Sequence, residues 1–419
     1  MPEETNIVAF VDVGTNSIHM LIVKFYEGSL GTPIYHDKES VRLGRSLYCR
    51  GRIDREALVK TKVVLSNFME IARNKGVSEV RAYATCAARE APNSDDLSKI
   101  VRDCGIKLRI ISGMEEARLT RLGVLGIECP QKTLLIDIGG GSTEIALCNG
   151  KEDMYLDSLN LGALRMSFGS GIDQSGKLTF KEYDELKRYV DVQSYRSVGK
   201  IRSLGFDTAF GSSGTLMALA QICASRRGDN DASYMLYSEL ESLMLEMCGM
   251  TVEERAKIPK LSAGRADIIL GGGAIAEELM YLYGVKRLEI SPYGLREGMQ
   301  IGYLLEKGFE NIDVRLSSAI TLMSRCGCDR SHAESVTEYA SKLYDGLKNI
   351  GVIDLPPQWR DLLRYAAIVH DVGEFINYDN HSDYSYLIIR NSYLAGFDNY
   401  ELELMALMAK FHHGSLPSA

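Results

Sequence analysis

Short apolar runs interrupted by polar turns mark the start of the chain. A β-branched run at residues 7–11 meets a polar turn at 12–17, and a second apolar run follows at 20–23. The same order of apolar run, polar turn and apolar run returns at residues 134–147. Apolar runs bounded by glycine-containing turns are typical of strands. The pattern therefore predicts a strand–turn–strand unit that occurs twice.

Positions with helical spacing alternate with further short apolar runs. Apolar side chains recur at helical spacing between residues 55 and 72, and a short strand is predicted at 80–83. After the second unit, the order of strand, glycine turn and helix is expected at 208–220 and again at 267–282, and a helix at 294–305 follows. Because strands alternate with helices, the sequence predicts an α/β fold.

The pattern changes from Asp313 onward, where strands are hard to find and helical spacing dominates. This part is predicted to form a separate α-helical domain. It contains five of the seven histidines of the chain: His332, His370, His381, His412 and His413. We therefore predict three domains, with the two α/β parts at residues 1–126 and 127–308 and the helical part at residues 309–419.

Length and charge narrow the class of protein. The chain has 419 residues, of which 45% are hydrophobic, enough for two or three separate cores. A net charge of −8 argues against a nucleic-acid-binding protein, which draws its affinity from clustered basic residues. There is no apolar run of about 18 residues and no signal-peptide pattern at the N-terminus. We expect a cytoplasmic protein with no membrane partner.

Nine cysteines are scattered along the chain without a CxxC pair, and they are expected to be reduced thiols. Cys326 and Cys328 could instead bind a metal ion, but ordinary thiols are the favoured interpretation.

Both copies of the strand–turn–strand unit begin their turn with an aspartate, Asp12 in the first and Asp137 in the second. Glycine turns that leave a strand let backbone N–H groups approach an anion, and the carboxylates could hold Mg²⁺ directly or through water. One such turn is compatible with a purely structural role, whereas two related turns predict that a chain of phosphates is gripped between them. The P-loop pattern GxxxxGK[ST] does not occur, so that class of phosphate-binding protein is not supported.

Longer strings of residues carry a resemblance to a known family. They are Asp12–Met20, Arg42–Gly44, Ala84–Arg89, Ile111–Arg118, Ile136–Glu144, Gly211–Thr215 and Leu295–Gly298. In this order they resemble the exopolyphosphatase and guanosine pentaphosphate phosphohydrolase family, within the superfamily of sugar kinases, heat-shock chaperones and actin. The resemblance implies two actin-like (ribonuclease H-like) domains that clasp a cleft, followed by an all-α HD-like domain that could be incomplete.

The resemblance also implies the catalytic residues. The family's catalytic glutamate corresponds to Glu116, and a carboxylate suits the task of orienting water and accepting its proton. Read without the resemblance, Glu115 and Glu116 are typical of the charged first turn of a helix. The resemblance implies instead that Glu116 is catalytic and that Glu115 is a spectator. Arg89 is expected to contact substrate phosphate with its two-pronged guanidinium, although a surface arginine beside Glu90 is the plainer interpretation.

The remaining site residues follow from the same resemblance. Asp137 and Glu144 are expected to hold Mg²⁺, for which Mn²⁺ could substitute. The predicted phosphate-binding residues are Asp12, Gly14, Thr15, Asn16, Ser17, Gly139, Gly140, Gly141, Ser142, Thr143, Gly211, Ser213, Gly214 and Arg265. Arg265 fits a charge at a helix end almost as well, and His19 is interpreted as a core histidine.

The histidine-rich domain has two interpretations. His332, the adjacent pair His370–Asp371, and His381 occur in the order of an HD-type metal phosphohydrolase, in which several helices bring imidazoles and a carboxylate to one ion. Such a site needs a further carboxylate from a later helix, and this closing ligand is not evident between His412–His413 and Ala419. Both a vestigial fold that extends the polymer-binding surface and a second working centre stay open.

We therefore expect an exopolyphosphatase that releases terminal orthophosphate from inorganic polyphosphate, by Mg²⁺-assisted attack of a water activated by Glu116. Hydrolysis of guanosine pentaphosphate (pppGpp) is the alternative, because it would use every catalytic residue named above. A small-molecule kinase of the same fold and a non-catalytic nucleotide-binding protein are further alternatives, and Glu116 with Arg89 argues against both. A homodimer is expected from the resemblance alone.

Overall fold

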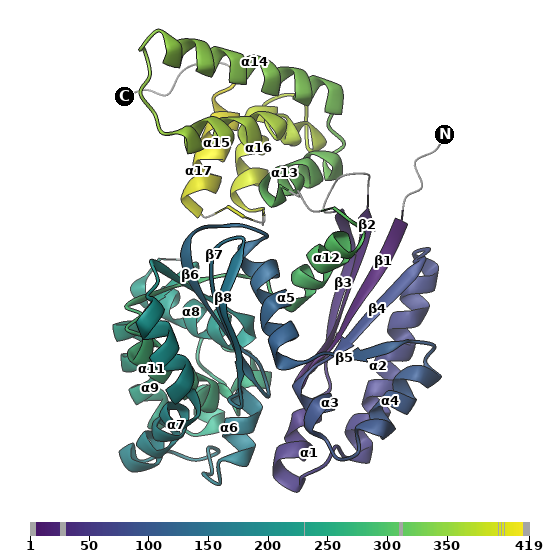
Figure 1. Cartoon of the computed structure of the whole chain (residues 1–419), viewed down its shortest axis with the longest axis vertical. Coiled ribbons are helices and arrows are strands. Elements are labelled where there is room, and N and C mark those ends of the chain that lie inside the picture. The colour runs from purple at the N-terminus through teal and green to yellow at the C-terminus, as the bar shows by residue number, and fades with distance from the viewer. Residues whose placement is uncertain are drawn as a thin grey trace. The chain divides into compact units, whose positions relative to one another are not determined.

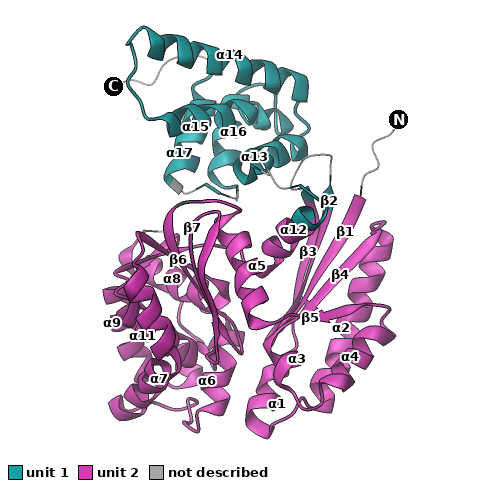
Figure 2. Cartoon of the chain, viewed as in Figure 1, with its two compact units in different colours: residues 1–5, 24–32, 304–419 teal, residues 6–23, 33–303 magenta. Residues whose placement is uncertain are grey.

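The computed structural model describes residues 6–25, 31–229, 231–309, 313–392, 394, 396–397 and 399–413. They form two compact units, which Figure 2 distinguishes by colour. The first, here called the α/β unit, comprises residues 6–23 and 33–303. The second, here called the helical unit, consists of the described residues within 24–32 and 304–419. In the described part of the chain, no helix combines the length and apolar character that crossing a membrane requires.

A five-stranded sheet in the order β3-β2-β1-β4-β5 begins the fold (Figure 1). Its strands are β1 Asn6–Val13, β2 Ser17–Phe25, β3 Thr32–Ser40, β4 Glu79–Ala84 and β5 Leu108–Ile110. The accompanying helices are α1 Leu43–Arg50, α2 Arg55–Asn74, α3 Cys86–Glu90, α4 Ser94–Asp103 and α5 Gly113–Leu125. Strands β1, β4 and β5 pair in parallel, as expected where helices connect successive strands.

A second sheet has six strands in the order β10-β11-β9-β6-β7-β8. Its strands are β6 Cys129–Ile138, β7 Thr143–Gly150, β8 Glu152–Leu159, β9 Thr208–Ser212, β10 Tyr234–Leu236 and β11 Arg287–Ile290. The helices of this part are α6 Ala163–Gly169, α7 Phe180–Leu204, α8 Ser213–Arg227, α9 Tyr237–Cys248, α10 Val252–Arg255, the 3₁₀ turn η1 Ala263–Arg265, α11 Ile269–Tyr283 and α12 Leu295–Glu306. The predicted mixed α/β fold is confirmed, and it contains two sheets.

The two strand–turn–strand units predicted from the sequence correspond to β1–β2 and β6–β7, and their turns share one hydrogen bond. The Gly14 N–H donates to the Ser17 carbonyl oxygen at 3.1 Å, and the Gly139 N–H donates to the Ser142 carbonyl oxygen at 2.9 Å. The repetition seen in the sequence is therefore a repetition of local structure.

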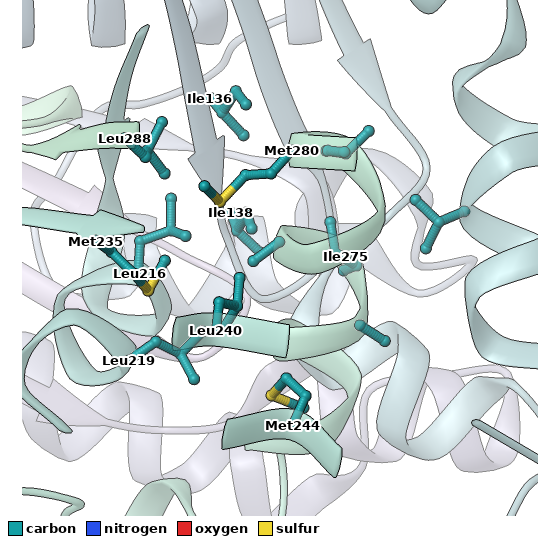
Figure 3. Close-up of a cluster of buried hydrophobic side chains, with 14 of the residues drawn as sticks. Ile136, Ile138, Leu216, Leu219, Met235, Leu240, Met244, Ile275, Met280 and Leu288 are labelled. Atoms are coloured by element: carbon teal, nitrogen blue, oxygen red, sulfur yellow. The ribbon is translucent and has the colours of Figure 1, made fainter. Parts of the chain in front are cut away.

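A continuous apolar core holds the second sheet in place (Figure 3). Ile136 and Ile138 of β6 are buried there, with Leu216 of α8 and Ile275 of α11 among their neighbours in the cluster. Because successive side chains of a strand point to opposite faces, Asp137 points away from this core. Burial of its two neighbours thus fixes the direction of the aspartate.

The prediction of a strand and a glycine turn within residues 267–282 is wrong. This segment forms helix α11, and its three glycines lie inside the helix rather than in a turn. A Cβ on Gly271 would lie 2.7 Å from Ser167 Oγ, and one on Gly273 would overlap the sulfur of Met244. The glycines therefore let α11 pack closely against α6 and α9, a requirement that a local pattern does not reveal.

The expectation that all cysteines are reduced thiols is also wrong for one pair. Cys129 and Cys148 form a disulfide between β6 and β7, whereas the other seven cysteines are free. A register shift between Cys129 and Thr133 accompanies this pairing, so sequence spacing alone could not predict it.

The helical unit contains α13 Val314–Arg325, α14 Arg330–Asn349, α15 Pro357–Ile368, the 3₁₀ turn η2 Val372–Phe375, α16 His381–Arg390 and α17 Asn399–Lys410. It has its own core, which includes Leu322, Tyr365, Val369, Ile389 and Met405. The predicted helical C-terminal region is confirmed. The three domain boundaries stay predictions.

Candidate active site

A row of polar side chains crosses the second sheet over four neighbouring strands. Register places Ser158 of β8 opposite Glu144 of β7, and Glu144 opposite Asp137 of β6. Asp137 in turn lies opposite Ser212 of β9. Ser158 Oγ donates to Glu144 Oε1 at 2.8 Å, and Ser212 Oγ donates to Asp137 Oδ1. Since directly opposed residues of neighbouring strands share a face, the two predicted metal-binding carboxylates lie side by side.

The carboxyls of Asp12, Asp137 and Glu144 are partly or fully buried close to other acidic groups, so ionising all of them together is unfavourable. Burial raises the pKa of Asp137 to about 6, although the Ser212 hydroxyl lowers it in part. Burial and the nearby charge of Glu116 raise the pKa of Asp12 to about 7. Burial, followed by the charges of Glu116 and Asp137, raises the pKa of Glu144 well above its ordinary value. A cation among these groups would offset their repulsion.

The residues present fit a magnesium ion that is held only partly by protein. Asp12 Oδ1 is buried and has no hydrogen-bond partner among the described residues. The clusters of three metal-binding side chains within 4.8 Å that the described residues form lie in the helical unit, not here. Mg²⁺ is commonly held by one or two carboxylates and completed by waters and substrate phosphates. Asp137 and Glu144 suit that arrangement.

The two glycine turns lie against one another. A Cβ added to Gly140 would come within 3.2 Å of Asn16 Cβ, and one added to Gly141 would come within 2.9 Å of Thr15 Oγ1. Side chains at these glycines would therefore push the turns apart. The structure brings together the turns that the sequence predicted to face one another.

Two predicted cradle residues have hydroxyls that are engaged within the protein. Thr143 Oγ1 donates to the Leu161 carbonyl oxygen at 2.8 Å, and Ser17 Oγ lies 2.7 Å from His19 Nε2. Ser142 is buried and Gly14 closes the first turn. A direct phosphate contact by these four residues stays a prediction.

Glu116 and Arg89 form an ion pair. Glu116 lies in the first turn of α5, whose N-cap is Ser112, and its Oε2 accepts from Arg89 Nη1 at 2.6 Å. The same Nη1 donates to the Ile111 carbonyl oxygen at 3.0 Å. Burial raises the pKa of Glu116 to about 7, although Arg89 opposes this shift. A general base works best when its pKa lies near the working pH, so the environment of Glu116 suits that role.

Glu115, the neighbour of Glu116, is placed differently. Its carboxylate accepts from Arg118 Nε at 2.8 Å and from Arg118 Nη2 at 2.9 Å. Hydrogen bonding to Arg118 lowers the pKa of Glu115. A carboxylate with this low pKa and this dedicated partner is poorly suited to accept a proton from water.

The end of β9 and the turn into α8 contain further predicted phosphate-binding residues, Gly211, Ser213 and Gly214. Ser213 has a φ of 84°, which non-glycine residues rarely adopt, and its Oγ donates to the Ile138 carbonyl oxygen at 2.6 Å. A Cβ on Gly214 would overlap the guanidinium of Arg265. Arg265 therefore lies directly on this turn. Gly211 is buried, and a Cβ there would lie 2.7 Å from Leu288, so this glycine allows close packing.

The sequence matches the profile described as the Ppx/GppA phosphatase family over residues 21–307, and that of domain III of the same family over residues 314–419. The chain belongs to the Ppx/GppA phosphatase family. The resemblance seen in the sequence strings is thereby confirmed, and membership makes the chain a hydrolase.

Individual proteins of similar sequence or structure agree with the family. A "Guanosine-5'-triphosphate,3'-diphosphate pyrophosphatase" from Aeromonas hydrophila subsp. hydrophila is 29% identical over 412 residues, which cover 96% of this chain and 79% of that protein. An exopolyphosphatase structure from Cytophaga hutchinsonii has a TM-score of 0.65 at 24% identity, covering 72% of this chain and 98% of that chain. A Ppx/GppA family member from Aquifex aeolicus has a TM-score of 0.60 at 24% identity, covering 72% and 99%. The two structures show that the fold is shared.

One string of this Ppx/GppA chain, Leu295–Gly298, has a role that the structure explains. A Cβ on Gly298 of α12 would overlap the Leu119 carbonyl oxygen of α5, and one on Gly123 of α5 would overlap the Gly294 carbonyl oxygen. Two helices thus meet through glycines, and one of them carries Glu116.

Gly298→Ala is expected to destabilise the protein by about 1–3 kcal/mol, the usual cost of overpacking, and to reduce the phosphatase rate by moving α5. Thermal unfolding and phosphate release would both be measured. Gly294→Ala is the matched control, because a Cβ there meets nothing within 4 Å. Equal behaviour of the two variants would contradict the proposed role of the close helix contact.

Three basic side chains near the carboxyls include two that the sequence did not single out. Lys38 is exposed on β3, and partial desolvation of its ammonium group, followed by the charges of Arg265 and Arg296, lowers its pKa to about 8. Burial, then Arg296, Lys38 and Arg265, lowers the pKa of His19 well below its ordinary value. Arg296 lies in a family string and could have been found there. Lys38 lies on β3 without a local signal.

In the helical unit, the predicted residues His332, His370, Asp371 and His381 come together. His412, which the sequence analysis did not place in the site, joins them. The only signal in the sequence was that His412 is one of the five histidines of the C-terminal region. Because it lies far along the chain from His370 and Asp371, no local pattern connected it with them.

Proposed function

We propose that the α/β unit hydrolyses the terminal phosphoanhydride bond of inorganic polyphosphate, with Glu116 as the general base. The observation that carries this proposal is the ion pair of buried Glu116 with half-buried Arg89, in which burial raises the pKa of the Glu116 carboxyl to about 7. It is supported by the two facing glycine turns and the carboxylates Asp137 and Glu144. Two actin-like halves that clasp a phosphate chain account for this arrangement.

In the proposed reaction, the oxygen of a water attacks the terminal phosphorus and the bond to the bridging oxygen breaks. Glu116 accepts the proton of the water, and the shortened chain leaves with the bridging oxygen. Arg89 would contact the transferring phosphoryl group, where charge develops. Bound Mg²⁺ or Mn²⁺, held by Asp137 and Glu144, would neutralise phosphate charge.

We favour polyphosphate over pppGpp as the substrate because several basic side chains lie near the carboxyls of the site. Beyond desolvation, the charges of Arg265 and Arg296 lower the pKa of Lys38, and those of Arg296 and Lys38 partly oppose the rise that burial causes in the pKa of Asp12. A row of cations suits a repeating polyanion, whose charge extends beyond the terminal phosphates.

Lys38→Ala is expected to raise KM for long-chain polyphosphate by a factor of roughly 10–150, because one charge-assisted contact of about 1.5–3 kcal/mol is lost. The increase for tripolyphosphate should be smaller. Steady-state phosphate release on both substrates measures the difference. Lys60→Ala, at an exposed position of α2, should leave both KM values unchanged. An equal rise for short and long substrates would contradict a role in chain binding.

The alternative substrate pppGpp is supported by the printed name of the Aeromonas relative. Purified protein with Mg²⁺ would be given long-chain polyphosphate, tripolyphosphate, pppGpp and ATP separately, and released phosphate would be measured. Preferential release from pppGpp would replace polyphosphate as the substrate. Phosphate transfer to a sugar or carboxylate would indicate a kinase, and binding without turnover would indicate a nucleotide-binding protein.

We also propose that the helical unit is HD-like. The proposal is supported by its all-helical core and by the convergence of His332, His370, Asp371 and His381.

A further inference from the structure

Four imidazole rings surround one carboxylate in the helical unit. The carboxylate belongs to Asp371, and the rings are those of His332, His370, His381 and His412. They border a cavity of about 710 Å³, whose lining also includes Cys328, Glu374, Tyr378 and Met408. His332 comes from α14, His370 and Asp371 from the turn between α15 and η2, His381 from α16, and His412 from just beyond α17, so only the folded unit assembles the group.

Three of the ligand atoms form a nearly equilateral triangle. Asp371 Oδ1 lies 3.5 Å from His381 Nε2 and 3.4 Å from His412 Nε2, and the two nitrogens are 3.2 Å apart. Ligands bound tetrahedrally at about 2.0–2.1 Å from Zn²⁺ lie roughly 3.3–3.4 Å from one another. The triangle therefore has the dimensions of one face of a tetrahedral metal site.

Hydrogen bonds on the far side of the rings set the direction of the lone pairs. His381 Nδ1 lies 3.0 Å from the Tyr378 carbonyl oxygen, and His412 Nδ1 lies 2.6 Å from the Ala409 carbonyl oxygen. A carbonyl only accepts, so each Nδ1 carries the proton and donates it. With each Nδ1 carrying the proton of a neutral ring, the Nε2 lone pairs point at one another and at the Asp371 carboxylate, an arrangement that a metal ion between them would satisfy.

The other oxygen of Asp371 is held separately. His370 Nε2 lies 2.9 Å from Asp371 Oδ2, and His370 Nδ1 lies 2.7 Å from the Ala367 carbonyl oxygen. His332, whose side chain is 56% exposed, lies 3.4 Å from the same Oδ2. Asp371 Oδ2 therefore faces His370 and His332, whereas Oδ1 faces His381 and His412.

We propose that Asp371, His381 and His412 bind one divalent transition-metal ion of the Zn²⁺ type, which is independent of the phosphatase site in the α/β unit. Two imidazoles and one carboxylate favour such borderline ions over Mg²⁺, which prefers oxygen ligands. Three protein ligands leave the fourth position to water or a small anion. His412 supplies an imidazole in the place of the later carboxylate that the HD-like pattern in the sequence lacked.

The test loads full-length protein with Zn²⁺, removes free metal by desalting, and measures bound zinc by elemental analysis. Wild-type protein is expected to retain about one equivalent more zinc than His381→Ala, His412→Ala and His412→Gln. His413→Ala is the matched control, because the neighbouring ring is outside the triangle, and it should retain the wild-type amount. Because wild type and all variants share the same α/β unit, zinc bound there contributes equally to each measurement and does not affect the difference.

Cobalt provides a second readout. Co²⁺-loaded wild-type protein and His413→Ala should show the visible d–d bands of a four-coordinate ion, which His412→Gln should lack. Circular dichroism would establish that each variant is folded. The proposal is overturned if folded His412→Gln retains as much zinc as wild type, or if wild type retains none because protons alone bridge the ring nitrogens.

Discussion

Glu116→Gln is expected to lower the rate of phosphate release from polyphosphate by a factor of about 10²–10⁴, the usual contribution of a positioned general base. The substitution keeps the shape of the side chain and removes its ability to accept a proton. Substrate affinity should change little, because the glycine turns and basic side chains are untouched. The kcat would be measured by phosphate release, and binding by calorimetry with a non-hydrolysed phosphate chain.

The matched control for this prediction is Glu115→Gln. Glu115 precedes Glu116 in the same helical turn but is paired with Arg118. Its substitution should leave kcat within a few-fold of the wild-type value. A Glu116→Gln variant with near wild-type turnover would remove Glu116 from the mechanism, whatever the substrate.

Arg89→Lys is expected to reduce kcat/KM by about 10²–10³, which is typical for the loss of one transition-state donor. Arg89 donates to Glu116 and to the Ile111 carbonyl through Nη1, and within the described part of the chain no hydrogen bond is seen from the rest of its planar fork, which could approach a phosphoryl group. Lysine keeps the charge but has no fork, so it cannot serve both partners at once. Kinetics on polyphosphate, with thermal unfolding as a check of stability, would measure the effect.

Arg118→Lys is the appropriate comparison, because it is also paired with a glutamate of α5. Its effect on kcat/KM should be small. If both arginine variants lose activity equally, the loss reflects a disturbed helix α5 rather than a lost phosphate contact.

Much of the α/β architecture was accessible from local patterns. The sequence predicts the strand–turn–strand units at β1–β2 and β6–β7 because apolar runs and glycine turns are local features. The helical part beyond Asp313 was equally clear. The prediction was wrong at α11, because its three glycines look like a glycine turn in the sequence. In the structure they lie within a helix and allow close contact with α6 and α9.

For the candidate site, the sequence by itself determined which chemical groups are present and to which family they belong. Glu116, Arg89 and the two aspartates that open the turns were all found in strings of neighbouring residues. Only the tertiary structure decided which of them act on one another: the ion pair of Glu116 and Arg89, the polar row from Ser158 to Ser212, and the positions of Lys38 and Arg296.

The same division holds in the helical unit. The order of His332, His370, Asp371 and His381 was visible along the chain, whereas His412 joined them only through the packing of α16 against α17. Pairing, burial and ligand geometry depend on distances between residues far apart in sequence. Those distances are set by the burial of apolar side chains in each core, so no local pattern contains them.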